Sequence, residues 1–216
     1  KLWRLCEKNG AIYKKMYGGF YCVGCEDYYT KKELVDGKCP EHLTIPEWVE
    51  EENYFFKLSR YQKQIENLIG SDTLLVIPRP RKNEVLSFVQ SGLEDFSISR
   101  SRKRAKNWGI PVPDDDSQVI YTWYDGLNAY QTAVGFGYDD VLWNKWWPAD
   151  VHVIGKGILR FHAVYWIGML LSAQLPLPKS IFVHGYISSG GLKMSKSLGN
   201  VIDPFEVIQK YGTDAT

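Results

Sequence analysis

The feature that most constrains the fold of this 216-residue chain is an alternation of short apolar runs with helix-compatible segments in its second half. The runs "FSIS", "QVIYTWYD", "DVHVIGK" and "SIFVHGY" are rich in β-branched and aromatic residues, as strands are. Segments 126–135, 156–173 and 203–211 are compatible with helices. The alternation predicts an α/β fold of parallel βαβ units, with an open sheet and helices on both faces. Ligands of such sheets bind beyond the carboxyl ends of the strands.

The first part of the chain carries helical signals of its own. Residues 1–16 predict a helix end followed by a short strand at 11–13. Residues 52–70 predict one helix, because apolar side chains recur at offsets of three and four: Phe55, Leu58, Tyr61, Ile65 and Leu68. The Pro-rich stretch "IPRPRKNEVLSFVQSGL" predicts another helix that ends near Gly92.

Charge and hydropathy narrow the class of protein. Lys+Arg minus Asp+Glu is 26 − 25 = +1, so any nucleic-acid partner has to be bound by local patches. No apolar run approaches eighteen residues, and we expect no membrane span. The start, "KLWRLCEKNG", lacks the features of a secretory signal, which favours a cytoplasmic protein. It also lacks an initiator Met, and we expect an interior piece of a longer chain.

Four metal-ligand residues occur in two close pairs. Cys22 and Cys25 are two residues apart, a spacer of thirteen residues follows, and Cys39 and His42 are again two residues apart. Two such pairs supply the tetrahedral ligand set of Zn²⁺. The site is predicted to be structural, because four protein ligands leave no open position for catalysis. The alternative is three free buried cysteines; Cys6 lies outside the spacing and is expected to be an ordinary buried thiol.

The stretch "GLKMSKSLGN", residues 191–200, has two lysines three apart between glycines and no acidic residue. It follows a predicted strand and precedes Asp203-Pro204, a pair that predicts a helix start. Such a turn is usually only solvated. A lysine loop beside a strand end can instead close over a triphosphate and neutralise charge that grows on leaving pyrophosphate.

Lys193-Met194-Ser195-Lys196-Ser197 is identical to the second ATP-binding motif of class I aminoacyl-tRNA synthetases. The segments "FSISRS", "NWGIPVP", "VIYTWYDGLNAY", "WWPADVHVIGKGILRFHAVYW" and "LPLPKSIFVHGY" precede it, and together they resemble methionyl-tRNA synthetases of the bacterial type. The resemblance covers essentially the whole chain. It implies the second half of a class I Rossmann-type nucleotide-binding catalytic domain with an inserted zinc-knuckle connective-peptide module.

The resemblance implies roles for the lysine loop. Lys193 and Lys196 are the implied catalytic residues, which bind the phosphates of ATP while the carboxylate of methionine attacks the α-phosphorus; ATP is implied to carry Mg²⁺. Lys196 is implied to matter more in the transition state. The other implied ATP-binding residues are Gly155, His184, Gly185 and Ser195.

The resemblance also implies a methionine pocket. Trp123 and Tyr130 would line it, since a thioether packs well on aromatic faces, and Arg100 would contact the carboxylate side. The other implied pocket residues are Gly126, Leu127, Ile158, His162 and Trp166. The last three lie four residues apart on one helix face, a pattern that by itself is more often core.

Two positions depart from the family. It usually has Ala where this chain has Gly126, which predicts a roomier pocket. It normally reads Gly-Lys-Asp where this chain has Gly157 in place of Asp. His152 has no implied role and is expected to be a strand histidine with its hydrogen bonds satisfied.

The implied activity is ATP-dependent ligation of methionine to tRNA(Met) through methionyl-adenylate. The N-terminal ATP motif and the C-terminal anticodon-binding domain would come from the remainder of the parent chain, and this piece alone is expected to be inactive. Two alternatives stay open: a class I synthetase for another apolar amino acid or cysteine, and a non-catalytic tRNA-binding paralogue. The implied division of the chain is the end of the first Rossmann half, the zinc-knuckle region, the second Rossmann half, and the lysine loop with the start of a stem-contact region: 1–16, 17–75, 76–190 and 191–216.

Overall fold

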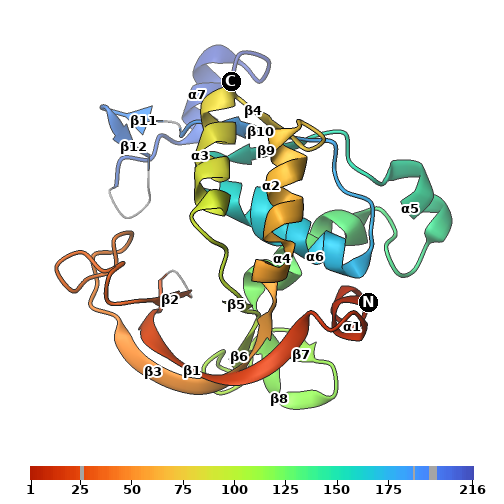
Figure 1. The fold of residues 1–216 in the computed structure, drawn as a ribbon. Coiled ribbons are helices and arrows are strands. Elements are labelled where there is room, and N and C mark those ends of the chain that lie inside the picture. The colour runs from red at the N-terminus through yellow and green to blue at the C-terminus, as the bar shows by residue number, and fades with distance from the viewer. Residues whose placement is uncertain (25–26, 187, 195–198) are drawn as a thin grey trace.

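The structure, a computed structural model, describes residues 1–24, 27–186, 188–194 and 199–216. The chain is mixed α/β, as expected. A long curved hairpin lies on one side of the body and a bundle of helices on the other (Figure 1).

A parallel sheet lies at the centre of the body. It contains β4 (Leu75–Ile77), β9 (His152–Gly155) and β10 (Ser180–His184) in the order β4-β10-β9. One face of this sheet is buried and carries His152, Ile154, Ile181 and Val183. The expectation of helices on both faces is wrong for the described residues, because the opposite face carries exposed apolar side chains. These are Leu75, Val153 and Phe182.

The runs "FSIS" and "QVIY" do not belong to the parallel sheet. β6 (Ser99–Ser101) and β7 (Pro111–Val112) pair antiparallel with the two sides of β8 (Asp115–Ile120). A strand that leads through a short connection back to its neighbour pairs antiparallel, whereas a parallel pair needs a long crossover. The alternation of the sequence thus holds only from β9 onward.

The hairpin consists of β1 (Ile12–Cys22) and β3 (Glu47–Phe56), with β2 (Asp27–Tyr29) beside β1 and β5 (Phe96–Ser97) beside β3. Two expectations are wrong here. The short strand at 11–13 runs on to Cys22, and the first part of the helix expected over 52–70 is strand. Phe55 and Phe56 are both buried, on opposite faces of β3, which a strand between two layers allows.

Helix α2 (Gln62–Gly70) covers the remainder of that segment, after a 3₁₀ turn over Leu58–Tyr61. Helix α3 (Arg79–Gln90) follows the Pro-rich entry as expected. Helix α4 (Thr122–Ala133) begins four residues earlier than expected, so "TWYD" is the first turn of a helix rather than a strand end. Two further helices, α1 (Leu2–Lys8) and α5 (Asp140–Trp146), lie before β9 in the sequence.

The helical stretch expected over 156–173 is present with three geometries. A 3₁₀ turn over Lys156–Ile158 leads into a π-helical turn over Phe161–Tyr165 and then into α6 (Trp166–Ala173). π turns widen a helix and are frequent at functional sites. Helix α6 is the centre of the apolar core: Trp166, Ile167, Met169 and Leu170 are fully buried.

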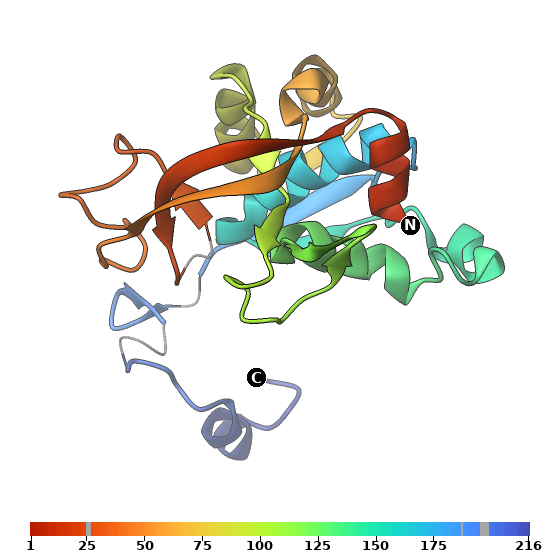
Figure 2. The same ribbon diagram turned by 90° about the horizontal axis from the view of Figure 1, so that it is seen from below.

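The C-terminal part leaves the body. The short strands β11 (Ser188–Ser189) and β12 (Leu192–Lys193) pair with each other, and α7 (Pro204–Tyr211) follows. The expected helix start is confirmed, since the Asp203 side chain accepts a hydrogen bond from the Phe205 N–H. Helix α7 has no buried residue and projects away from the body (Figure 2). None of the helices in the described part of the chain has the length and apolar character needed to cross a membrane.

Candidate active site and metal group

A hydrogen-bonded chain joins α4 to the π-helical turn. The Tyr130 hydroxyl lies 2.9 Å from His162 Nε2, and His162 Nδ1 lies 2.9 Å from the Ile158 carbonyl oxygen. Burial lowers the pKa of His162, although the hydrogen bond to Ile158 opposes this, so the ring is neutral near pH 7. A carbonyl oxygen only accepts, so Nδ1 carries the proton and Nε2 accepts from the Tyr130 hydroxyl. The structure thus brings together three of the expected pocket residues, Tyr130, His162 and Ile158, and fixes the direction of the hydrogen bonds between them.

Trp123 is the second residue of α4 and stacks on Phe161, with ring centroids 4.2 Å apart and an interplanar angle of 13°. Phe161 is adjacent to His162, so this stack and the Tyr130 hydrogen bond anchor α4 to the same helical turn. Leu127 is buried on the inner side of α4, whereas Gly126 is exposed with open space where a Cβ would stand.

A second aromatic layer lies behind this group. The His152 ring lies 4.6 Å from the Tyr130 ring and 6.3 Å from the Trp147 ring, measured between centroids. Trp147 in turn meets the edge of Trp166 at 6.4 Å. Trp166, an expected pocket residue, is fully buried.

His152 lies in a strand as expected, but the expectation that its hydrogen bonds are satisfied is wrong for one nitrogen. Nε2 is buried without a hydrogen-bond partner among the described residues. Burial, with a smaller contribution from His162, lowers the pKa of His152 to about 4.

Arg100 belongs to a different group. It stands on β6, its guanidinium lies 4.1 Å over the Tyr121 ring, and it donates to the Ser99 carbonyl oxygen at 2.8 Å. It lines a cleft of about 1160 Å³ together with Tyr121 and Asp125, where burial raises the pKa of the Asp125 carboxyl. The cleft adjoins the first turn of α4, whereas Tyr130 and His162 lie two turns further on.

The expected nucleotide-binding residues of the sheet lie side by side. Gly155 and His184 are paired at the carboxyl ends of β9 and β10, and exposed Gly185 follows. His184 Nδ1 lies 2.7 Å from the Gly185 carbonyl oxygen. The space beside Gly157 is filled by the Tyr186 hydroxyl.

The lysine loop is described only in part. Lys193 ends β12, whose backbone pairs with Ser188 of β11. Ser195 and Lys196 lie outside the described residues.

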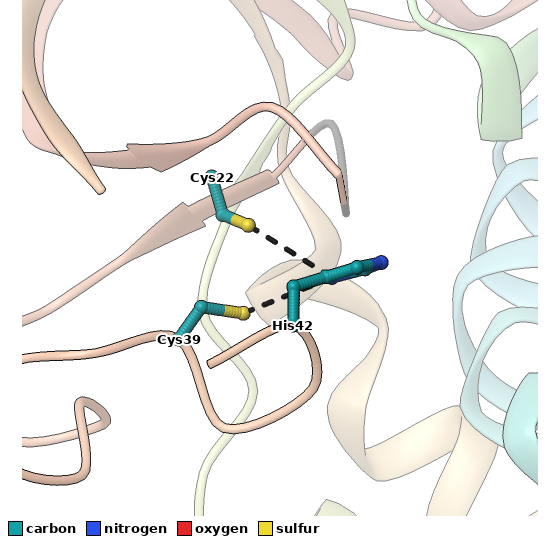
Figure 3. A group of neighbouring side chains, drawn as sticks. All are labelled: Cys22, Cys39 and His42. Atoms are coloured by element: carbon teal, nitrogen blue, oxygen red, sulfur yellow. Dashed lines mark hydrogen bonds between the residues drawn. The ribbon is translucent and has the colours of Figure 1, made fainter. Parts of the chain in front are cut away.

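Three of the four expected metal ligands converge at the tip of the hairpin. The ligand atoms of Cys22, Cys39 and His42 lie within 4.8 Å of one another, with His42 Nδ1 3.9 Å from Cys22 Sγ and 4.0 Å from Cys39 Sγ (Figure 3). The fourth, Cys25, lies outside the described residues. Cys6 is a buried free thiol beneath α6, as expected.

The local geometry of this group fits a metal ion. Tetrahedral zinc with ordinary bond lengths separates a sulfur from a nitrogen ligand by about 3.6 Å, close to the distances seen here. The His42 ring lies against Gly24, where a Cβ would stand only 2.7 Å from the ring. Gly24, two residues after Cys22, therefore leaves the space that the His42 ring occupies.

The family model of the class I tRNA synthetases (M) matches residues 1–45 and 42–216, which is the whole chain. The chain belongs to the class I tRNA synthetase (M) family.

Relatives within the family agree. The chain is 50% identical to a methionine–tRNA ligase of Brucella suis over 99% of its own length and 42% of that protein. It is 49% identical to the chloroplastic/mitochondrial methionine–tRNA ligase of Arabidopsis thaliana over 96% of its length and 34% of that protein. The chain thus spans about two fifths of the length of the curated class I relatives it matches, or less.

A solved structure extends the agreement to three dimensions. Mycobacterium tuberculosis methionyl-tRNA synthetase in complex with methionyl-adenylate superposes with a TM-score of 0.90 at 43% identity, over 99% of this chain and 42% of that one. The expected α/β class I fold and the resemblance to methionyl-tRNA synthetases are thereby confirmed.

Two residues that contact the expected pocket residues were not predicted from the sequence. Phe161 stacks on Trp123 and His152 lies against Tyr130, and neither was assigned a role. The sequence signal for Phe161 is its place beside His162 in "RFH". His152 had none, because an inward strand histidine is usually only core.

Proposed function

We propose that this chain forms the methionine-binding half of the catalytic domain of an enzyme that joins L-methionine to tRNA(Met) through methionyl-adenylate. The observation that carries the proposal is the chain of hydrogen bonds from Tyr130 through His162 to the Ile158 carbonyl, next to the Trp123–Phe161 stack. We also propose the four-part division at residues 16, 75 and 190.

The pocket discriminates by softness and shape. A thioether is polarizable and packs well against aromatic rings, which Trp123 and Tyr130 supply. Because the Tyr130 hydroxyl donates its hydrogen to His162, it turns oxygen lone pairs toward the pocket. A ligand whose side chain has no strong donor leaves this arrangement intact. Leucine, isoleucine and valine also lack a donor, and they would be distinguished by fit.

The proposed chemistry is acyl activation and transfer. A carboxylate oxygen of methionine forms a bond to the α-phosphorus of ATP, and the bond from that phosphorus to pyrophosphate breaks. A ribose hydroxyl at the end of the tRNA then attacks the carbonyl carbon, and AMP leaves. Lys193 and Lys196 would neutralise the charge on the leaving pyrophosphate, with Mg²⁺ bound to the ATP. Gly155, His184 and Gly185 would contact the adenosine, and Arg100 the methionine carboxylate.

We propose that the metal group binds Zn²⁺ through Cys22, Cys25, Cys39 and His42. Zinc held by four protein ligands ties their loops together and leaves no position for substrate. Its role is therefore to hold the tip of the hairpin.

The proposed activity needs parts of a longer protein in addition to this chain. A parallel sheet is normally covered on both faces, yet Val153 and Phe182 stand exposed on one of them. This open face supports the proposal that further parts of a longer protein, among them an N-terminal ATP motif, pack there. An anticodon-binding domain is expected as well, because the curated relatives are much longer.

The test is amino-acid-dependent exchange between ATP and pyrophosphate, measured for the protein at its natural full length. We expect exchange with methionine at least about a hundredfold faster than with leucine, isoleucine, valine or cysteine. Faster exchange with one of the other amino acids would reassign the substrate. Tight tRNA binding without exchange by any amino acid would identify a non-catalytic binder.

A further inference from the structure

His152 occupies a position that the strand pattern reserves for an apolar side chain. It is the first residue of β9, in register with Ile181 of β10, and shares the inward face with Ile154. It is 7% exposed, and Nε2 finds no hydrogen-bond partner in the described part of the chain. Burying an imidazole nitrogen without a hydrogen-bond partner costs free energy of folding. We therefore look for an interaction of the ring that explains a histidine at this position.

The neighbours of His152 indicate what that interaction is. Its ring packs against Tyr130, His162 and Trp147, at centroid distances of 4.6, 6.2 and 6.3 Å. Tyr130 itself is 39% exposed, so core packing restrains it only weakly. Of the two ring contacts described for Tyr130, the one to His152 is closer than the one to His162, which is 5.6 Å.

The hydrogen bond alone does not fix the tyrosine. A single 2.9 Å bond from the hydroxyl to His162 Nε2 restrains the tip of the ring but leaves the ring free to rotate about it. A second contact on the ring body removes that freedom, and His152 provides it from the edge strand of the sheet. The position of His152 is in turn determined by backbone pairing to β10 and by Trp147, whose Nε1 donates to the Pro176 carbonyl oxygen at 2.9 Å.

We propose that His152 is a positioning residue for the methionine pocket: its ring holds Tyr130 in the orientation in which the hydroxyl reaches His162. The inference rests on the proposed function. It adds a residue that does not touch the ligand and acts through Tyr130.

The experiment uses the full-length protein and measures KM for methionine and KM for ATP in pyrophosphate exchange. An aromatic contact is worth up to about a tenfold change in an equilibrium constant. His152→Ala is expected to raise KM for methionine about tenfold, with KM for ATP within twofold. His152→Phe keeps an aromatic ring at this place and is expected to stay within about threefold of the unmutated protein.

A double-mutant cycle separates positioning from general destabilisation. In a Tyr130→Phe background the hydroxyl is gone, so His152→Ala should change KM for methionine less than twofold further. Val141→Ala, on the exposed side of α5, is the control, and it should change neither constant. Melting temperatures of all variants show whether each is folded.

The proposal would be overturned by an unchanged KM for methionine in His152→Ala, by equal increases in both KM values, or by additivity with Tyr130→Phe. A His152→Phe variant as impaired as His152→Ala would likewise exclude a role of the ring contact. Failure of the unmutated protein to exchange with methionine is a separate result, which refutes the proposed function and this inference with it.

Discussion

The proposed methionine pocket and the proposed metal group are both built from histidine and a few neighbours, but they are held together differently. His162 is buried in the apolar core, and its partner Tyr130 is fixed by a hydrogen bond and ring contacts. His42 is exposed on a loop near the hairpin tip, with exposed apolar residues around the group: Val23, Val35, Leu43 and Ile45. Packing therefore organises the first site. For the second, whose cysteines are buried but whose histidine is exposed, we propose that the bound Zn²⁺ does so. The predictions below test that difference.

Loss of the metal should have the largest effect, and only at the hairpin tip. Structural zinc contributes about 10 kcal/mol or more to the folding of small metal-binding peptides. Chelation, or Cys39→Ser, should abolish hydrogen-exchange protection over residues 27–46 while the β1–β3 ladder stays protected. Hydrogen exchange followed by mass spectrometry measures this segment by segment.

Cys6→Ser is the matched control, because that thiol lies under α6 and outside the group. It should leave the zinc content unchanged. Identical exchange at the tip with and without zinc would show that packing suffices there as well.

Tyr130→Phe should weaken methionine binding while the fold stays intact. The variant leaves buried His162 Nε2 without its donor, which costs about 1–3 kcal/mol of folding stability. The ring also loses the bond that fixes its orientation at the pocket, so KM for methionine should rise severalfold. KM for ATP should change little. Steady-state exchange kinetics give both constants; an unchanged KM for methionine would remove the hydroxyl from the account.

Acid should destabilise the pocket side of the molecule. Burial lowers the pKa of His152 from 6.5 to about 4, and it also lowers that of His162. The unfolded chain binds these protons first as the pH falls below 6.5, so stability decreases between pH 6.5 and about 4 and is unaffected by these groups above that range.

The titratable groups that face His152 are Tyr130 and His162, and only the latter titrates near this range. Melting temperatures from pH 7.5 to 4.5 should therefore decrease less steeply for His152→Phe than for the unmutated protein. Parallel curves would show that His152 is not buried as a neutral ring.

Much of the fold was predictable because its signals are local. The Pro-rich entry of α3 and the Asp203-Pro204 start of α7 depend on groups within a few residues. The strand β3 was not predictable, because Phe55 belongs to a helical spacing and only pairing with distant β1 selects the extended form.

The candidate site shows the same division. The spacing of Cys22, Cys39 and His42 in the sequence predicted that they lie together as a metal group. The roles of Tyr130 and His162 were predicted from the resemblance to a family. The contact of His152 with Tyr130 joins residues from different elements, and neither their types nor their spacing indicates it.

Two glycines should give the smallest effects, and they should differ. A Cβ at Gly24 would press on the His42 ring, which a bound metal holds in place, so Gly24→Ala should lower zinc affinity about tenfold. A Cβ at Gly157 meets only the tip of the Tyr186 side chain, which can rotate away. Gly157→Ala should therefore change the free energy of unfolding by less than about 1 kcal/mol.

Zinc competition titration and urea unfolding measure the two quantities. Equal effects of both substitutions would contradict the idea that the metal makes its surroundings rigid.

The most direct test of the account is to look for the proposed intermediate itself. The full-length protein, loaded with zinc, is incubated with methionine, ATP and Mg²⁺ without tRNA, and the species bound to it are identified by mass spectrometry. The account predicts bound methionyl-adenylate in a one-to-one ratio with protein, with one pyrophosphate released, and much less of both for Tyr130→Phe at limiting methionine. Folded, zinc-loaded protein that forms no adenylate would contradict it.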